Sequence, residues 1–143
     1  MIRNFRQSDL RDIEKIYEKS NNALCLKTPA GFFKNDKKNF LSYTLSRCRN
    51  LVFEENGRAA GVISFSDGYI EGLFVLPEYW NRGIGTALLN SAADGKKELR
   101  LQVYADNSRG FEFYRKRGFK VVGGGICRMT GLEYLEMERT ESF

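Results

Sequence analysis

The fold of this chain is decided by the stretch Leu73-Phe74-Val75-Leu76-Pro77-Glu78-Tyr79-Trp80-Asn81-Arg82-Gly83-Ile84-Gly85-Thr86-Ala87-Leu88-Leu89. It predicts an apolar strand, a short polar turn and the glycine-rich start of a helix. Gly83 and Gly85 leave the turn without side chains, so a ligand can approach the backbone closely. The first N–H groups of a helix are unpaired and lie at the positive end of its dipole, which suits an anion such as pyrophosphate.

Two familiar phosphate motifs do not fit this turn. A dinucleotide-binding G-x-G-x-x-G motif needs glycine or alanine at the position occupied by Leu88. A Walker A loop needs lysine followed by serine or threonine after its last glycine, and that pair does not follow Gly85. The turn therefore belongs to another class of anion site.

A second segment, Asn107-Ser108-Arg109-Gly110-Phe111-Glu112-Phe113-Tyr114-Arg115-Lys116-Arg117-Gly118-Phe119, follows another predicted strand. Taken together, the two segments predict a strand, a loop with the pattern R-G-x-G, a helix and a second strand. An asparagine then begins a helix that contains F-Y, and G-F follows this helix. This order resembles the GNAT superfamily of acyl-CoA-dependent N-acetyltransferases, closely over residues 51–122. The resemblance implies one domain over residues 1–143 in the α/β (α+β) class, with a mixed, splayed β-sheet flanked by about four helices.

Composition agrees with a single soluble globular domain. The chain has 143 residues, of which 42% are hydrophobic and 29% charged. No apolar run is long enough to span a membrane, and Met1 to Arg6 lack a signal-peptide pattern, so we expect a cytoplasmic protein. Cys25, Cys48 and Cys127 are odd in number and widely spaced, which predicts free thiols rather than disulfides or a zinc site.

The chain contains no histidine. This excludes Ser-His-Asp and Cys-His catalytic systems and argues against a typical zinc site, so we expect no metal. Any general base must be a carboxylate, a tyrosine, a lysine or a relayed water. The net charge of +5 is spread among 18 acidic residues without a nucleic-acid-binding motif. The positive excess instead suits a multiply anionic cofactor.

Periodicity and turn residues predict the order β-α-α-β-β-β-α-β-α-β-β. We expect Ser8 to cap the first helix, residues 20–22 to end it, and residues 23–34 to be irregular. We also expect Gly118 to end the last helix and Gly123-Gly124-Gly125 to form a flexible break. The strands are predicted at 2–6, 51–54, 59–66, 69–76, 99–104, 119–122 and 132–139, and the helices from Ser8 to 20–22, at 36–47, from the glycine loop to 93, and at 107–117.

The resemblance implies acetyl-CoA as cosubstrate and direct attack by an amine, without an acyl-enzyme. Tyr114 matches the family tyrosine, whose hydroxyl points at the thioester sulfur and acts as general acid. A phenol has a reference pKa of ~10 and therefore keeps its proton at neutral pH. The alternative is a core tyrosine that packs its helix on the sheet.

Glu71 lies next to Gly72, near the position where many relatives carry an acid facing the acceptor amine. A partly desolvated carboxylate there can accept the proton of the amine, directly or through water. The alternative is a solvated acid, or one that only binds a cationic substrate. Gly72 itself predicts a bulge or a close backbone approach.

Further positions match the cofactor contacts of the family. The backbone of Phe74 and Val75 is expected to pair with pantetheine, and an N–H near Leu73 or Phe74 to serve the oxyanion. Asn107 is expected to bind pantetheine and to cap its helix. The residues expected at the pyrophosphate, including arginines that pair with phosphate, are Asn81, Arg82, Gly83, Ile84, Gly85, Thr86 and Arg117, with Arg115 as a further candidate.

Two residues depart from the family pattern. Trp80 stands where the loop normally begins with glutamine or arginine, so one phosphate contact is missing from its usual place. The indole is expected to stack on the cofactor or to fill a surface groove. Gly110 stands where relatives usually carry alanine, at a cost of ~1 kcal/mol in helix propensity. This glycine indicates either tolerance or tight passage of the cofactor.

The acceptor is expected between the first two helices and the final hairpin, beside Phe32, Phe33, Glu71 and Tyr134. Protein lysines, N-termini, amino acids and polyamine-like amines all remain open, as do a monomer and a homodimer. The rival to an enzyme is a non-catalytic acyl-CoA-binding sensor or regulatory module.

Overall fold

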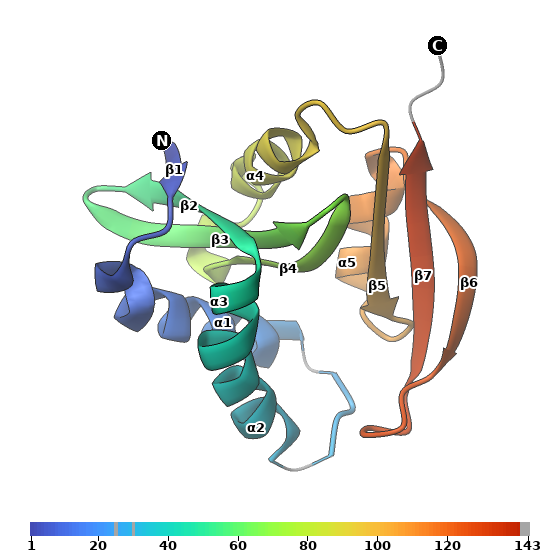
Figure 1. Cartoon of the computed structure of the whole chain (residues 1–143). Coiled ribbons are helices and arrows are strands. Elements are labelled where there is room, and N and C mark those ends of the chain that lie inside the picture. The colour runs from blue at the N-terminus through green and yellow to red at the C-terminus, as the bar shows by residue number, and fades with distance from the viewer. Residues whose placement is uncertain (25, 30, 141–143) are drawn as a thin grey trace.

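A seven-stranded mixed sheet with the order β1-β2-β3-β4-β5-β7-β6 forms the centre of the protein (Figure 1). The computed structural model describes residues 1–24, 26–29 and 31–140. Neighbouring strands pair antiparallel, except for the parallel pair β4 and β5. The strands are β1 (Ile2–Asn4), β2 (Arg49–Glu55), β3 (Arg58–Ser66), β4 (Tyr69–Val75), β5 (Glu98–Tyr104), β6 (Lys120–Ile126) and β7 (Glu133–Thr140).

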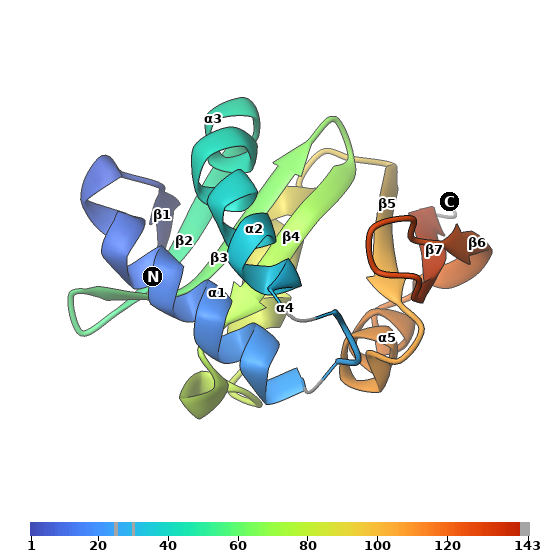
Figure 2. The same ribbon diagram turned by 90° about the horizontal axis from the view of Figure 1, so that it is seen from below.

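Helices cover both faces of this sheet, as Figures 1 and 2 show. One face carries α1 (Leu10–Leu24) and a second helical stretch, in which α2 (Phe32–Asn39), a π-helical turn (Phe40–Thr44) and α3 (Leu45–Arg47) follow one another. The other face carries α4 (Ile84–Ala93) and α5 (Ser108–Lys116). If the second stretch is taken as one helix, the predicted fold class of a mixed sheet with about four helices is confirmed.

Each face has its own hydrophobic core. On one side, Ile13 and Ile16 of α1 pack with Phe40 and with Val62 of β3. On the other side, Leu88 of α4 belongs to a separate cluster with residues of β2 to β5 and β7. The central strand β3 is buried along both faces, which fits its nearly continuous apolar sequence.

The sheet splays between β4 and β5. These two strands share one register pair, Tyr69 with Arg100, beside a hydrogen bond from the N–H of Arg100 to the carbonyl of Gly68 at 2.9 Å. Beyond this point the two strands diverge, so the following edge of β4 faces a gap rather than a neighbouring strand (Figure 1). The predicted splay is thus confirmed.

A bulge in β4 sets which of its side chains join the core. Ser64 of β3 pairs with Gly72, and the next residue of β3 pairs with Ile70, so Glu71 is the extra residue. Because of this insertion, Ile70, Leu73 and Val75 all join the core beside α4, whereas strict alternation would separate Ile70 from the other two. The bulge predicted at Gly72 is confirmed.

The first helix begins differently from the sequence prediction. Its first turn is a 3-10 segment, Gln7–Asp9, and the Asp9 carboxylate accepts a hydrogen bond from the N–H of Arg6 at 2.8 Å. The predicted Ser8 cap is therefore wrong. Arg6 is the N-cap residue, and two hydrogen bonds from Arg3, at 2.8 and 2.9 Å, hold the Asp9 carboxylate in place.

The first helix also continues past the predicted stop at residues 20–22 and ends at Leu24. Ser20 donates a hydrogen bond to the carbonyl of Ile16 at 2.6 Å, and the Asn21 amide donates to the carbonyl of Tyr17 at 2.9 Å. These bonds back onto the preceding turn satisfy both polar side chains inside the helix.

The second helical stretch begins at Phe32 rather than at residue 36, so the predicted irregular segment 23–34 is too long at both ends. Gly31, with a φ of 83°, turns the chain into this helix from the left-handed region. Cys25, which lies between the two helices in sequence, falls outside the described residues.

The three glycines at 123–125 do not form the predicted break, because they lie within β6. A Cβ atom at Gly124 would come 2.7 Å from the carbonyl oxygen of Tyr134, and one at Gly125 would come 2.9 Å from its hydroxyl. Glycine is needed here because β6 passes close to Tyr134 on β7.

The Arg3–Asp9 pair gives a stability prediction. Both side chains are largely buried, with exposed fractions of 12% for Arg3 and 6% for Asp9, and the closest distance between a nitrogen of Arg3 and an oxygen of Asp9 is 2.8 Å. Asp9→Asn should lower the free energy of unfolding by about 1.5–3 kcal/mol, because Arg3 loses its charge-assisted hydrogen bonds to Asp9 but keeps the one to Glu54 at 2.7 Å. Urea denaturation measures this, with Arg58→Gln as control because the Arg58 side chain is 67% exposed. An unchanged midpoint in Asp9→Asn would contradict the prediction.

The same pair predicts a pH dependence. The hydrogen bonds from Arg3 hold the pKa of Asp9 below its ordinary value. Its contribution to stability is therefore fully present above pH ~4, the ordinary value of an aspartate, and is lost as the pH falls through the depressed folded-state pKa. Asp9→Asn should remove this part of the acid destabilisation, as denaturation curves at several pH values would measure.

Candidate active site

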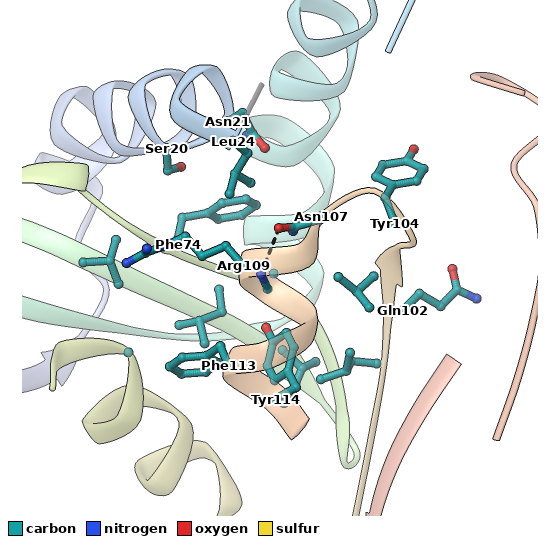
Figure 3. Close-up of a pocket in the computed structure, with 18 of the residues that line it drawn as sticks. Ser20, Asn21, Leu24, Phe74, Gln102, Tyr104, Asn107, Arg109, Phe113 and Tyr114 are labelled. Atoms are coloured by element: carbon teal, nitrogen blue, oxygen red, sulfur yellow. Dashed lines mark hydrogen bonds between the residues drawn. The ribbon is translucent and has the colours of Figure 1, made fainter. Parts of the chain in front are cut away.

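A cavity of about 760 Å³ opens where β4 and β5 diverge (Figure 3). Among the described residues, it brings together nearly all of the residues predicted for the site. Two arginines are the exceptions. The guanidinium of Arg82 lies 5.0 Å from the ring centroid of Tyr79 and outside the cavity lining, and Arg115 also lies outside the lining and pairs with Glu112 at 2.8 Å. The predicted residues that line the cavity are Phe32, Phe33, Glu71, Phe74, Val75, Asn81, Gly83, Ile84, Gly85, Thr86, Asn107, Tyr114, Arg117 and Tyr134.

The glycine loop presents a run of backbone donors to this cavity. Within the part of the chain that the structure describes, the N–H groups from Asn81 to Thr86 have no acceptor, and no side chain caps α4. Asn81 and Gly83 have φ values of 65° and 83°, a left-handed geometry that helps turn successive N–H groups toward one side. The loop therefore has the donors that a phosphate group requires.

The two glycines of the loop have different roles. A Cβ atom at Gly83 would meet nothing within 4 Å, whereas one at Gly85 would come 3.1 Å from the ring of Phe113. Gly85 thus lets α4 pack against α5, and Gly83 leaves the approach to the loop open. The positive φ of Gly83 also makes any branched residue there strained.

The edge of β4 offers backbone groups to the gap. The N–H of Leu76 donates to the carbonyl of Ala60 at 2.9 Å, and the hydrogen-bonded pairs of an antiparallel ladder alternate from there. The backbone of Phe74 is therefore used by β3, and the backbone groups of Leu73 and Val75 face the gap. Phe74 enters the cavity through its ring rather than through its backbone.

Trp80 is fixed in the wall of the cavity. Its indole N–H donates to the carbonyl of Val75 at 2.7 Å, so that carbonyl has a partner on its open side. The remaining groups at this edge are those of Leu73 and the N–H of Val75.

The predicted cap of α5 is confirmed. Asn107 accepts a hydrogen bond from the N–H of Gly110 at 2.9 Å. A Cβ atom at Gly110 would lie 2.6 Å from the Asn107 side chain. Gly110 is thus explained by the close fit of the capping asparagine.

Arg117 joins α4 to α5. Two of its nitrogens donate to the Thr86 hydroxyl at 2.8 and 2.6 Å, and a third donates to the carbonyl of Phe113 at 2.8 Å. Its guanidinium also lies 3.7 Å from the centroid of the Phe113 ring. Most of its hydrogen-bonding capacity is therefore used within the protein.

Tyr114 projects from α5 and points its hydroxyl into the cavity (Figure 3). Its ring packs edge-on against Phe113 and Phe119, with centroids 5.2 and 5.4 Å away. Among the described residues its hydroxyl has no hydrogen-bond partner. Burial raises the pKa of Tyr114 above its ordinary value, so the phenol keeps its proton at neutral pH.

Glu71 lines the cavity but is exposed, so the partial desolvation expected from the sequence is absent. The negative charge of its carboxylate affects the pKa of two neighbouring side chains. Burial, together with the negative charge of Glu71, raises the pKa of Tyr69 to about 12. The same two causes raise the pKa of Cys48.

Polar residues that no sequence motif marks also line the cavity. The Tyr17 hydroxyl from α1 donates to the Asp36 carboxylate from α2, and burial is the main cause that raises the pKa of Tyr17. Opposite them, the Tyr104 hydroxyl donates to the sulfur of Cys127 at 3.7 Å. The pKa of Cys127 is lowered to about 7, chiefly by a hydrogen bond with the Thr130 side chain.

Potential metal ligands do not gather in the described part of the chain. No three or more His, Cys, Asp or Glu side chains in residues 1–24, 26–29 and 31–140 are grouped so that they could hold a metal ion. In the same ranges, no helix is both long and apolar enough to cross a membrane. Cys48 and Cys127 are free thiols, and Cys25 lies outside these ranges.

The protein has an acetyltransferase fold, with a splayed sheet, Tyr114 on α5 and a loop of N–H donors from Asn81 to Thr86, here called the donor loop. Sequence comparison agrees. The chain belongs to the acetyltransferase (GNAT) family, whose family model matches residues 10–119. It is similar to the peptidyl-lysine N-acetyltransferase YiaC of Escherichia coli strain K12, with 35% identity over 79 residues. That match covers 54% of this chain and 54% of YiaC, so it spans about half the length of the relative.

Solved structures share the whole fold. The solution structure of apo-form YjaB from Escherichia coli has a TM-score of 0.86 at 23% identity and covers 99% of this chain and 98% of YjaB. The PaiA N-acetyltransferase of Thermoplasma acidophilum, solved in complex with coenzyme A, has a TM-score of 0.78 at 22% identity. That match covers 99% of this chain and 98% of PaiA.

Proposed function

We propose that the protein transfers an acetyl group from acetyl-CoA to a primary amine by direct attack of the amine on the thioester. The observation that carries this proposal is the run of backbone N–H groups from Asn81 to Thr86, which has no acceptor among the described residues and faces the cavity that Tyr114 enters. Membership of the acetyltransferase (GNAT) family and the coenzyme A complex of PaiA support it.

The residues present fit acetyl-CoA. The N–H groups of Asn81 to Thr86 would hold the pyrophosphate, and the carbonyl of Leu73 and the N–H of Val75 would pair with the pantetheine amides. A cavity of about 760 Å³ is of the size that ligands of this class occupy. Asn107, at the start of α5, lines the same cavity and would contact the pantetheine.

Acetyl-CoA supplies the activated acyl group, so the protein contributes mainly orientation and electrostatics. The N–H of Leu73 at the open edge of β4 would stabilise the carbonyl oxygen as it gains negative charge. Tyr114 would give its proton to the departing sulfur. A thiol has a reference pKa of ~8.5, below that of a phenol, so this transfer is completed when the positively charged nitrogen of the adduct gives its proton to the phenolate.

Glu71 is the candidate that receives the earlier proton, which the ammonium form of the amine loses before it attacks the thioester. Its carboxylate is exposed at the cavity and stands on the bulge of β4, close to the point where the two strands part. An exposed carboxylate exchanges protons readily with water, which favours a route through a water molecule. Attraction of a cationic amine to the same carboxylate is the alternative role.

The experiment that tests the proposed function measures release of free thiol from acetyl-CoA with a library of primary amines. Lysine peptides come first, because the name of YiaC specifies peptidyl-lysine. Peptides with free N-termini, amino acids and polyamines complete the library. We expect amine-dependent thiol release with formation of the acetylated amine. Tight binding of acetyl-CoA without transfer to any of these amines would favour the rival sensor.

Glu71→Gln distinguishes the two roles of this carboxylate. If Glu71 receives the proton, turnover of the wild type should rise with pH through an ionisation that the variant lacks. If it only attracts the amine, the variant should raise KM and spare kcat. We expect a partial defect in both constants, because the amine also loses protons to solvent. Wild-type kcat, KM and pH profile in Glu71→Gln would remove Glu71 from the mechanism.

A further inference from the structure

Trp80 and Arg109 form a stacked pair at the edge of the cavity. The Arg109 guanidinium carbon lies 4.0 Å from the centroid of the Trp80 ring, and one of its nitrogens donates to the side-chain oxygen of Asn81 at 3.3 Å. All three residues line the cavity, and Arg109 extends into it from α5 (Figure 3). The bond from the indole to the carbonyl of Val75 fixes the ring, so Arg109 rests on a rigid platform.

Arg109 has no carboxylate partner among the described residues. Other arginines of this protein do have one: Arg3 pairs with Asp9, and Arg115, on the same helix as Arg109, pairs with Glu112 at 2.8 Å. A guanidinium that lies flat on an aromatic ring keeps the N–H donors of its edge available. Arg109 thus brings an uncompensated positive charge with free donors to the cavity.

The surroundings of Arg109 attract an anion. The donor loop of Asn81 to Thr86 lies on one side, and α5 begins at Ser108, so the positive ends of two helices meet near this guanidinium. The neighbouring acid, Asp106, accepts a hydrogen bond from the backbone of Lys27 at 3.1 Å.

We propose that Arg109, stacked on Trp80, binds the pyrophosphate of coenzyme A. In this arrangement Trp80 does not replace the missing polar side chain of the loop; it supports an arginine from another helix that does so. The other candidate arginines are less suited, since Arg117 is bonded to Thr86 and Phe113, and both Arg82 and Arg115 lie outside the cavity lining. This inference rests on the proposed function, because it requires coenzyme A as the ligand.

Calorimetric titration of the wild type and Arg109→Ala tests the proposal with three ligands. These are coenzyme A, dephospho-coenzyme A, which lacks the 3′-phosphate, and pantetheine, which lacks every phosphate. Charge-assisted hydrogen bonds of an arginine to phosphate correspond to a loss of about 10- to 100-fold in affinity. We expect this loss for coenzyme A and for dephospho-coenzyme A, and unchanged binding of pantetheine.

Further variants distinguish the specific role of the Trp80–Arg109 pair from a general effect of positive charge. Arg109→Lys should recover part of the affinity, because lysine keeps the charge but loses the planar fork and the stacking. Arg115→Ala, which removes a paired arginine from the same helix, should bind like the wild type. When Trp80 is already replaced by alanine, Arg109→Ala should lower the affinity for coenzyme A by a smaller factor than in the wild type. When Trp80 is replaced by phenylalanine, which keeps a ring face, Arg109→Ala should lower it by the full factor.

Tryptophan fluorescence gives an independent signal, since Trp80 is the single tryptophan of the chain. Coenzyme A should change its emission in the wild type, and Arg109→Ala should change the emission of the free protein. Equal affinity of Arg109→Ala and the wild type for coenzyme A would overturn this inference and leave the proposed function standing. A loss seen with coenzyme A but not with dephospho-coenzyme A would overturn the assignment to pyrophosphate. A wild type that does not bind coenzyme A would refute the proposed function itself.

Discussion

Replacing Tyr114 by phenylalanine should lower turnover by a factor of about 10²–10⁴, the usual contribution of a general acid, and leave the affinity for acetyl-CoA unchanged. The phenol points into the cavity, and burial raises its pKa, so the proton is present throughout the neutral range. Phenylalanine keeps the edge-on packing against Phe113 and Phe119 and removes only the donor. Single-turnover kinetics under conditions where chemistry limits the rate, together with calorimetry for affinity, measure both quantities.

The matched control is Tyr43→Phe, because Tyr43 is 53% exposed and lies outside the cavity lining. This variant should behave like the wild type in both measurements. Turnover of Tyr114→Phe within twofold of the wild type would make Tyr114 a packing residue, the role that its ring contacts alone would give it.

Replacing Gly83 by valine should weaken acetyl-CoA binding by about 100-fold or more, since several hydrogen bonds to a charged group are lost together. A Cβ atom at this position meets no protein atom within 4 Å, so the added side chain occupies open space beside the donor loop. The φ of 83° also strains a β-branched residue, so some loss of stability is expected as well. Calorimetry and thermal unfolding separate the two effects.

Gly57→Val provides a control for the strain. Gly57 has a φ of 77° and lies in the turn between β2 and β3, and a Cβ atom at this position would also meet nothing within 4 Å. The variant should lose stability to a similar extent and bind acetyl-CoA like the wild type. Unchanged affinity in a folded Gly83→Val protein would show that the pyrophosphate does not bind at this loop.

Features with local causes could be predicted from the sequence. Asn56-Gly57 is a typical hairpin-turn sequence and forms the turn between β2 and β3, with φ values of 52° and 77°, because these residue types tolerate the left-handed region. Gly118, with a φ of 94°, ends α5 for the same reason. The donor loop, Asn107 and Tyr114 reach one cavity because each stands at a fixed position relative to a strand end or helix start that the sequence marks.

Features that depend on which partner a side chain or backbone segment meets in the folded protein could not be predicted. Ser20 and Asn21 resemble a helix stop in sequence, but they bond to the preceding turn of α1 and continue it. The glycines at 123–125 resemble a flexible linker until Tyr134 of β7 is placed beside them. The stacking of Arg109 on Trp80 joins residues of two different helix starts, and no motif connects them.

Titration of isotope-labelled protein with acetyl-CoA, followed by backbone amide NMR shifts, locates the cofactor directly. If acetyl-CoA binds where β4 and β5 part, with its pyrophosphate at the start of α4, the amides of Asn81 to Thr86 should show the largest shifts. Those of Leu73 and Val75 should follow. Saturable shifts confined to other surfaces, or no shift at millimolar acetyl-CoA, would contradict this placement of the cofactor.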